Sequence, residues 1–554
     1  SFAGGLERIA REARVPIIPV ALDRLWGSIF SHEGGRVFWK LPRRLPFKVD
    51  VSIGAPMNPD ATAFQVRQRI AEQVAELRTE RQGRRGSLAW RFLKEARANA
   101  GRPAVLDSTG AELDYRKLMV GALCMRDVLR PHLGEARSVA VLMPPGAGGA
   151  LVNLALALDG RTSVNLNYTM SNGDLAGMCE TAGAEHVITA RRFLSGLDRP
   201  SPLGDAQTIL LEDIRKDIST GMKLRYLALS FLPGVVLANL LAPRRRGNVP
   251  ESEEVATVIF SSGSTGVPKG VMLTHSNILS NVQSVLEVIA LGPGDGVLGI
   301  LPFFHSFGYT VSLWATFLSG ARGVYHVNPL EAKVVGELSQ KGGVTITIAT
   351  PTFYQSYLRR CTKEQFAGIR VALSGAQKLN QGLADAWKEK FGSELMEGYG
   401  CTEAAPVVSV NLPGGAHLPP RHRGHRQGSI GRPLPGVAVK VVDPDAYPAA
   451  DPAEVIEREG GESGLILVKG PNVMKGYIEM PEKTAEVLRD GWYTTGDIGY
   501  IDRDGFLFIT DRLSRFSKIG GEMVPHGRVE EVIGDLMFEL LEPSNEGADE
   551  EGVV

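Results

Sequence analysis

The sequence predicts a large α/β protein of several domains. Its 554 residues correspond to roughly three to four domain-sized units. From Ser138 onward, short apolar runs alternate with stretches of helical periodicity, which is typical of layered α/β domains. In addition, the apolar run at residues 255–260 passes directly into a loop of Ser, Thr and Gly that ends at Lys269. A strand followed by such a loop is a common way to hold an anion.

The overall composition excludes several classes of function. Lys and Arg number 61 and Asp and Glu 62, so the net charge of −1 provides no basic field and we expect no nucleic-acid partner. The four cysteines, at 124, 179, 361 and 401, form no C-x-x-C pair and no metal-ligand spacing, which fits a reducing compartment. Cys401 could be a catalytic thiol, but the local sequence supplies no paired base and favours a small packed residue.

The N-terminal segment predicts a small unit that precedes the main domain. We expect a helix over residues 4–13, strands over 15–23 and 47–57, and a further helix beginning at residue 63. A basic, Gly-containing stretch follows that helix. We therefore assign residues 1–82 to the N-terminal unit and 83–90 to a linker.

The next segment predicts the first strands and helices of the main domain. Strands are expected at 138–146 and 162–169, and helices through 151–160 and 173–189. The pattern G-x-G-x-x-G at 294–299 precedes an apolar run and opens no helix, so it fails as a dinucleotide-binding motif.

Residues 226–243 contain no charged side chain and are followed by three arginines. Their length would permit a membrane span, but Pro233 and Gly234 interrupt the centre. Two interpretations remain open: a segment lying in the membrane interface, with arginines at anionic headgroups, or a buried pair of helices.

The loop after residue 260 has the chemistry of a phosphate clamp. Small residues let backbone N–H groups converge on an anion, hydroxyls donate hydrogen bonds, and a lysine adds charge. It is not a Walker A loop, because Pro268 stands where that pattern needs Gly. A plain surface turn is the alternative. The candidate phosphate-binding residues are Ser261, Ser262, Gly263, Ser264, Thr265, Gly266 and Lys269.

Six ordered motifs then resemble those of the adenylate-forming superfamily, which contains acyl-CoA synthetases, acyl-acyl carrier protein synthetases and peptide-synthetase adenylation domains. They are SSGSTGVPKG (261–270), LPFFHSFG (301–308), LSGAQKL (373–379), GYGCTEAAP (398–406), YTTGDIG (493–499) and TDRLSRFSKIGGEMV (510–524). The resemblance covers roughly residues 86–554 and implies an adenylate-forming α/β fold. It implies an adenylation domain over 91–513 and the beginning of a small α+β C-terminal subdomain over 514–554.

The resemblance also implies ATP and Mg²⁺ as cofactors. Glu403 would coordinate Mg²⁺ with Ser261 nearby, which suits a hard cation held by carboxylate and phosphate oxygens. Thr402 would donate a hydrogen bond to the α-phosphate, and His305 would act at the substrate carboxylate or as a gate. By itself, a lone His between aromatic residues is more often a buried structural side chain.

Nucleotide recognition is implied for a further group of residues. Tyr399 could stack on the base, and the ribose hydroxyls would meet a carboxylate and a guanidinium. By themselves, an Asp in a TGD turn is often a backbone cap and an Arg a surface charge. The implied residues are Gly375, Ala376, Gln377, Gly398, Tyr399 and Gly400 for adenine, and Asp497 and Arg512 for ribose.

Members of the superfamily rotate their C-terminal subdomain about a hinge that matches Ser514, where Asp or Lys is usual. Lys518 matches the loop that shapes the thiol channel. The resemblance also implies a catalytic lysine beyond residue 554, and losing one such charge costs roughly 3–4 kcal/mol of transition-state stabilisation. We therefore expect this chain to bind ATP but to adenylate slowly.

Residues 5–30 resemble the end of a glycerolipid acyltransferase domain, although no His here has the Asp five places on that those enzymes need as a base and orienting pair. Together with the adenylation motifs, this resembles the bifunctional acyl-acyl carrier protein synthetase/2-acylglycerophosphoethanolamine acyltransferase family. The implied partners are a fatty acid, acyl carrier protein or coenzyme A, a lysophospholipid and a membrane surface. The implied location is the cytoplasmic face of the bacterial inner membrane. Two alternatives stay open: a long-chain acyl-CoA synthetase, and a non-catalytic ATP- and lipid-binding membrane module.

Overall fold

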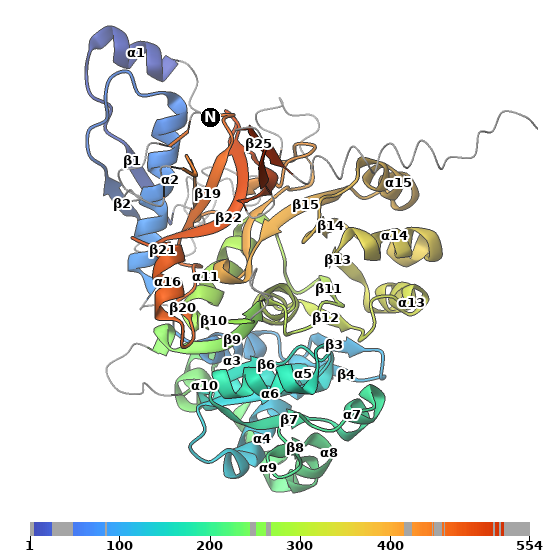
Figure 1. The fold of residues 1–554 in the computed structure, drawn as a ribbon. Coiled ribbons are helices and arrows are strands. Elements are labelled where there is room, and N and C mark those ends of the chain that lie inside the picture. Colours follow the sequence, from blue (N-terminus) through green and yellow to red (C-terminus); the bar gives the residue numbers. More distant parts are fainter. Residues whose placement is uncertain are drawn as a thin grey trace, which may run out of the picture.

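Figure 1 shows the fold, a computed structural model, as two large sheets with flanking helices, a smaller sheet beside them and an N-terminal unit along one side. The structure describes residues 5–24, 48–82, 86–243, 251–261, 268–414, 424–445, 447, 457–458, 460–513, 516–519 and 522–525.

The first large sheet has seven strands in the order β20-β10-β9-β6-β5-β7-β8. Its central strands are parallel, whereas β10 lies antiparallel to β9 and β20. Helix α5 packs on β5 and β6, and α6 packs on β7. The strands are β5 (Ser138–Val141), β6 (Thr162–Asn165), β7 (Ala184–Thr189), β8 (Thr208–Leu210), β9 (Val255–Ser261), β10 (Lys269–Thr274) and β20 (Gly476–Tyr477).

The second large sheet has nine strands in the order β17-β16-β15-β14-β13-β11-β12-β3-β4 and is parallel from β15 to β3. Consecutive parallel strands need helical crossovers, and α13, α14 and α15 supply them. The strands are β3 (Pro103–Asp107), β4 (Glu112–Asp114), β11 (Gly296–Gly299), β12 (Arg322–Tyr325), β13 (Val344–Ala349), β14 (Val371–Ser374), β15 (Leu395–Gly400), β16 (Val407–Val410) and β17 (Arg432–Pro433).

A smaller antiparallel sheet follows, in the order β18-β19-β22-β21 with β23 also paired to β22. A separate hairpin, β24–β25, lies beyond it. These strands are β18 (Ala438–Val442), β19 (Gly464–Lys469), β21 (Leu488–Arg489), β22 (Trp492–Ile501), β23 (Leu507–Arg512), β24 (Phe516–Ile519) and β25 (Glu522–Pro525).

The helices begin and end at recognisable signals. Thr274 and Asn277 form a capping box that starts α11, and Gly160, in the left-handed region at φ 70°, ends α5. The longer helices of the main domain are α3 (Leu88–Ala98), α4 (Tyr115–Leu133), α5 (Ala147–Asp159), α6 (Asn172–Thr181), α9 (Thr220–Leu229), α10 (Gly234–Leu241), α11 (His275–Val288), α13 (Ala332–Gly342), α14 (Pro351–Arg360) and α15 (Gln381–Phe391). The shorter ones are α7 (Arg191–Leu197), α8 (Leu211–Ile214), α12 (Thr316–Ser319), α16 (Pro481–Val487) and a π-helix, η5 (Gly308–Ala315).

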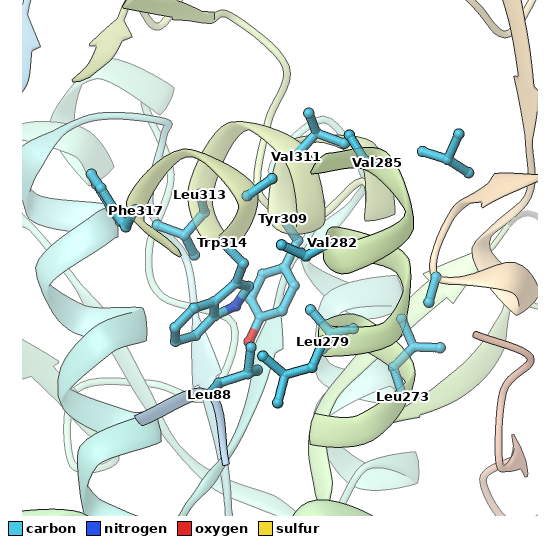
Figure 2. Packing of buried hydrophobic residues seen from close by; sticks show 14 of the residues in the cluster. Leu88, Leu273, Leu279, Val282, Val285, Tyr309, Val311, Leu313, Trp314 and Phe317 are labelled. Atoms are coloured by element: carbon cyan, nitrogen blue, oxygen red, sulfur yellow. The ribbon is translucent and has the colours of Figure 1, made fainter. Parts of the chain in front are cut away.

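The main core lies where the two large sheets meet. Figure 2 shows α11 and η5 facing one another across this core, with Leu279, Val282 and Val285 opposite Tyr309 and Trp314. Trp314 and Tyr309 are fully buried, and their rings meet edge to face at 6.2 Å. This packing fixes η5, which begins at Gly308, the last residue of the LPFFHSFG motif.

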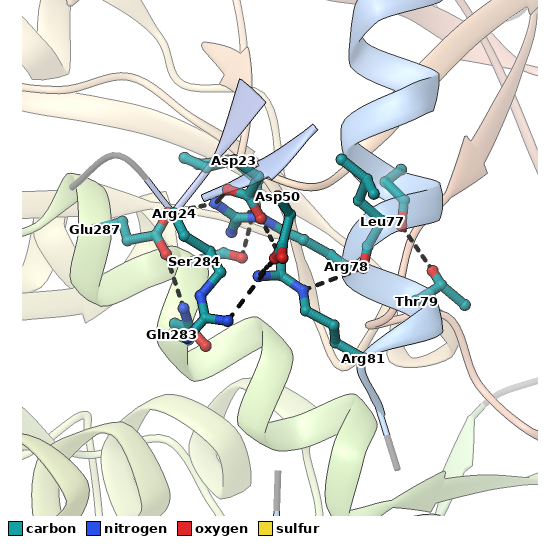
Figure 3. Close-up of polar contacts among 12 residues, drawn as sticks. Asp23, Arg24, Asp50, Leu77, Arg78, Thr79, Arg81, Gln283, Ser284 and Glu287 are labelled. Carbon is teal, nitrogen blue, oxygen red and sulfur yellow. Dashed lines mark hydrogen bonds and ion pairs between the residues drawn. The ribbon is translucent and has the colours of Figure 1, made fainter. Parts of the chain in front are cut away.

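The N-terminal unit contains α1 (Gly5–Ala13), a hairpin of β1 (Val20–Asp23) with β2 (Asp50–Ile53), and α2 (Ala63–Glu80). Figure 3 shows Arg78 of α2 between Asp23 and Glu287, at 3.0 and 2.9 Å, while Arg81 bridges Asp23 and Asp50. Because Glu287 belongs to α11, the Arg78–Glu287 ion pair, which is largely buried, joins this unit to the main domain.

The structure corrects two sequence expectations. The predicted helix over 173–189 is a helix, α6, followed by the strand β7, because Gly183 takes φ 61° and a β-branched run follows it. The uncharged segment 226–243 is neither a fully buried pair nor one continuous helix: α9 and α10 each bury one face and expose the other. Among the described residues, no helix is long and apolar enough to span a membrane.

The remaining N-terminal expectations agree with the structure, with β1 and β2 shorter than predicted. The glycines of 294–299 lie in and before β11, which supports their exclusion as a dinucleotide motif. The predicted domain boundaries and the acyltransferase origin of the N-terminal unit stay predictions.

Candidate active site

The predicted phosphate loop joins two strands of a hairpin. Strand β9 ends at Ser261, β10 begins at Lys269, and these two residues are direct partners in the antiparallel register. The ends of the loop therefore lie side by side, with the Lys269 backbone opposite that of Ser261. A strand-to-strand loop differs from the strand-to-helix context of a Walker A motif, in agreement with the sequence argument. Ser262, Gly263, Ser264, Thr265 and Gly266 lie outside the described residues.

Tyr477 connects Glu403 to this hairpin. Glu403 belongs to a short 3-10 turn, Thr402–Ala404, directly after β15, and it is 8% exposed. The Tyr477 hydroxyl donates a hydrogen bond of 2.9 Å to Glu403 Oε1. Tyr477 lies on β20, which pairs with β10, and Lys269 Nζ is 5.3 Å from the centre of its ring. The lysine, the phenol and the carboxylate thus form one cluster beside the loop.

The charge of this cluster fits a bound cation and a phosphate chain. Burial, followed by the negative charge of Glu403, raises the pKa of Tyr477 well above its usual range, so the phenol stays a donor. Tyr477 donates to one carboxylate oxygen, and that leaves the second available to a hard cation. Mg²⁺ is usually held by one or two carboxylates together with substrate phosphates. Among the described residues, no group of three or more acidic, His or Cys side chains could hold a metal alone.

The LPFFHSFG motif meets the GYGCTE motif at one contact. Ser306 Oγ and Thr402 Oγ1 are 3.4 Å apart, so the loop that precedes η5 touches the predicted α-phosphate donor. His305 is exposed, and its ring lies 4.7 Å from that of Phe304. The structure thus brings His305 next to the residue that contacts Thr402, while its role stays a prediction.

Tyr399, Asp497 and Arg512 come together although they are far apart in sequence. Asp497 and Arg512 are cross-strand partners on β22 and β23, and Arg512 Nε donates to Asp497 Oδ1 at 3.1 Å. The Tyr399 hydroxyl, from the end of β15, donates to the other oxygen of Asp497. Asp497 is 6% exposed, and burial raises its pKa despite these donors. Two protein donors therefore orient a buried carboxylate at the predicted ribose position.

The predicted adenine residues line the strand ends beside this triad. Gly375 follows β14, and Ala376 takes φ 69° with Gln377 exposed after it. Gly398 and Gly400 belong to β15, and an added Cβ at Gly400 would lie 2.3 Å from the carbonyl oxygen of Pro406. Only glycine fits at that position.

An apolar cavity of about 20 Å³ lies against the same strand ends. Phe307 and Val311 come from the motif and from η5, Gly375 and Gly398 from the strand ends, and Val285 from α11. Its walls are almost entirely apolar. Gly375 and Gly398 are among the predicted adenine residues, so the cavity adjoins that part of the site.

Cys401 fits the packed interpretation. Burial raises the pKa of its thiol well above the usual value, which opposes thiolate formation. The side chain of Lys518 and the hinge candidate Ser514 lie outside what the structure describes; the backbone of Lys518 pairs with Met523 in the β24–β25 hairpin.

Sequence reasoning missed Tyr477 and Ser306 as site residues. Tyr477 lies 74 residues beyond Glu403 in a two-residue strand, where no periodicity marks it. Ser306 lies in the LPFFHSFG motif, where His305 alone was predicted to act. In both cases the decisive signal is a contact made only by the folded chain.

Comparison with known proteins gives the same assignment. A family model described as AMP-binding enzyme matches residues 92–478. This chain belongs to the AMP-binding enzyme family. The family confirms the predicted adenylate-forming fold and the predicted cofactors, ATP and Mg²⁺.

Among similar sequences, a long-chain-fatty-acid–CoA ligase of Salmonella typhimurium is 29% identical over 470 residues, covering 81% of this chain and 80% of the relative. A long-chain-fatty-acid–CoA ligase of Bacillus subtilis is 34% identical over 291 residues, or 51% and 49% of the two chains. Among solved structures, o-succinylbenzoate CoA synthetase from Bacillus subtilis, in complex with its acyl-adenylate intermediate, superposes with a TM-score of 0.64 at 25% identity, covering 80% and 82%.

These relatives make the chain a homologue of long-chain-fatty-acid–CoA ligases. They favour the acyl-CoA synthetase alternative over the carrier-protein and acyltransferase interpretation of the sequence.

Proposed function

We propose that this protein activates a long-chain fatty acid with ATP and transfers the acyl group to the thiol of coenzyme A. The names of its relatives support the fatty acid and coenzyme A as substrates. One structural observation carries the proposal: the fold brings Lys269, Tyr477 and Glu403 into one cluster beside the predicted phosphate loop. Tyr399, Asp497 and Arg512 form a second group at the predicted ribose position. This arrangement suits a substrate acid that reacts with a nucleotide.

The first step joins the two substrates. A fatty-acid carboxylate oxygen attacks the α-phosphorus of ATP, the bond from that phosphorus to the bridging oxygen breaks, and pyrophosphate leaves. Lys269 and the loop it ends would hold the departing phosphates, and Thr402 would donate to the α-phosphate. Mg²⁺, with Glu403 as its protein ligand, would neutralise charge on the phosphates. Asp497 would accept from the ribose hydroxyls, with Tyr399 and Arg512 holding it in position.

The second step forms the thioester. The coenzyme A sulfur, as thiolate, attacks the acyl carbonyl carbon, and AMP leaves with the electrons of the carbon–oxygen bond. Neither step requires a base for the fatty acid, because carboxylates are already ionised at pH 7. This is why His305 is assigned no proton-transfer role.

A product assay tests the proposal. The purified chain receives ATP, Mg²⁺ and palmitate with either coenzyme A or phosphopantetheinylated acyl carrier protein. We expect AMP and palmitoyl-CoA in equal amounts. Two results would contradict the proposal: consumption of ATP without release of AMP, or no thioester formed with either acceptor.

A second candidate keeps acyl carrier protein as the acceptor, with later transfer to a lysophospholipid at the cytoplasmic face of the bacterial inner membrane. The observation that favours it is the N-terminal unit, whose sequence resembles the end of a glycerolipid acyltransferase domain and which is joined to α11 by the Arg78–Glu287 pair. Palmitoyl-carrier protein formed in preference to palmitoyl-CoA would support this candidate.

A further inference from the structure

We propose that helices α9 and α10 form a docking surface for an anionic lipid bilayer. These two helices and the turn between them expose large apolar side chains that are between 39% and 60% accessible: Leu224, Leu227, Phe231, Val235, Val236 and Leu240. In the described part of residues 86–513, the other large apolar side chains with such exposure are Leu330 and Leu513. Surface apolar residues scattered singly are ordinary, whereas a set gathered on one short stretch marks an interaction site.

The opposite faces of the two helices hold them firmly on the domain. Tyr226 and Leu237 are buried, at 1% and 0% exposure. Arg126 of α4 donates to the Tyr226 hydroxyl at 2.8 Å and to the Leu241 carbonyl at 3.1 Å, so one guanidinium holds both helices. Arg97 of α3 donates to the Leu232 carbonyl at 2.9 Å, in the turn between them. The exposed apolar set is therefore presented by a fixed scaffold.

The surroundings of this surface are cationic and aromatic. Residues 220–241 contain Lys223 and Arg225, both exposed, and no acidic residue. The Arg116 guanidinium lies 4.4 Å from the centre of the Phe231 ring. On α3, Lys94 Nζ lies 5.7 Å from the ring of Trp90, whose indole donates to Asn239 of α10 at 2.8 Å. The single acidic residue of α3, Glu95, is half-buried.

This combination fits a bilayer surface. Apolar side chains enter the headgroup boundary, Trp and Phe are stable at that depth, and Lys and Arg meet anionic lipid phosphates. A symmetric contact between two copies would instead place Lys223 and Arg225 near the same cations of the partner, which costs free energy. Helices of ten and eight residues are also far too short to span a bilayer. The contact is therefore peripheral.

Vesicle flotation of the whole chain tests the proposal, with vesicles of phosphatidylcholine alone or with added phosphatidylglycerol. ATP and fatty acid are left out, so failure of the proposed ligase function would not affect the result. We expect binding to the anionic vesicles that weakens as salt is raised. The double variant Val236→Asn/Leu240→Asn should bind roughly tenfold more weakly, because it removes apolar area that would enter the bilayer on binding. Leu224→Asn/Leu227→Asn, on the other helix, should do the same.

Leu330→Asn is the matched control, since it removes an exposed leucine elsewhere and should bind like the parent. Lys223→Ser/Arg225→Ser should lose about tenfold on anionic vesicles and change little on neutral ones. Equal binding by both apolar double variants and the parent, with unchanged thermal midpoints, would overturn the proposal. A parent chain that does not bind the vesicles but self-associates through these helices would also overturn it.

Discussion

At the scale of single residues, Glu403 and Tyr477 make the sharpest prediction. Glu403→Gln keeps the shape of the side chain but removes the charge that would hold Mg²⁺, and we expect palmitate-dependent pyrophosphate exchange to fall by about two to three orders of magnitude. Tyr477→Phe removes one hydrogen bond to that carboxylate and should cost about ten- to thirtyfold. Glu364→Gln, at an exposed glutamate, should exchange at the parental rate. Equal rates for all three variants would exclude Glu403 from the site.

Asp497 predicts a pH effect on nucleotide binding. Burial raises its pKa, so its carboxylate is lost on acidification earlier than that of an ordinary aspartate. The KM for ATP should therefore rise as the pH falls toward that raised pKa. In Asp497→Asn, the KM should be about tenfold or more higher at neutral pH and should change less with pH. Asp385→Asn, at an exposed position, should keep the parental dependence of the KM for ATP on pH. The parental dependence in Asp497→Asn would refute the ribose assignment.

His275 predicts a pH effect on stability. Burial lowers its pKa to about 4, and its Nδ1 accepts a hydrogen bond from the Leu88 backbone N–H at 3.4 Å. The unfolded chain takes up a proton near pH 6.5 and the folded chain does not, so stability falls as the pH drops from about 6.5 to 4, by up to about 3 kcal/mol. Thermal midpoints should decline over that window and decline less in His275→Gln. The exposed His132→Gln should leave the decline unchanged.

At the scale of elements, the attachment of helix α2 to the main domain depends on one buried arginine. Arg78→Ala would leave Asp23 and Glu287 without their shared partner, and breaking such a buried pair costs about 3–5 kcal/mol. We expect limited proteolysis to cut the N-terminal unit faster in Arg78→Ala. Arg11→Ala, which removes an exposed pair with Asp60, should be cut at the parental rate. Equal cutting of the two variants would show that the Arg78 network does not join the units.

Elements also mark where sequence reasoning succeeds. The strands β5, β6 and β9 and the helices α2 and α5 follow from apolar periodicity and turn residues. The split of residues 173–189 into α6 and β7 was missed because a helical period over the first half conceals the strand that follows Gly183. For residues 226–243, two interpretations stay open from sequence, because the actual form of this segment depends on its packing against α3 and α4.

At the scale of the whole molecule, motifs predicted which residues form the site, and the fold supplies how they meet. Two separate motifs predict Asp497 and Arg512 as the ribose-binding pair, and the β22–β23 register shows that they are direct partners that form one unit with Tyr399. Tyr477 could not be predicted, because its contact with Glu403 exists only after β20 pairs with β10. The apolar cavity likewise forms from α11, η5 and residues of the strands β13 to β16.

The proposed function requires that a fatty acid and ATP react at this site. Palmitate-dependent exchange of labelled pyrophosphate into ATP, measured with Mg²⁺ and without a thiol acceptor, is its sharpest test. We expect exchange that requires both palmitate and Mg²⁺ and that Glu403→Gln lowers by about two to three orders of magnitude. Nucleotide binding without any palmitate-dependent exchange would contradict it and would favour a non-catalytic module.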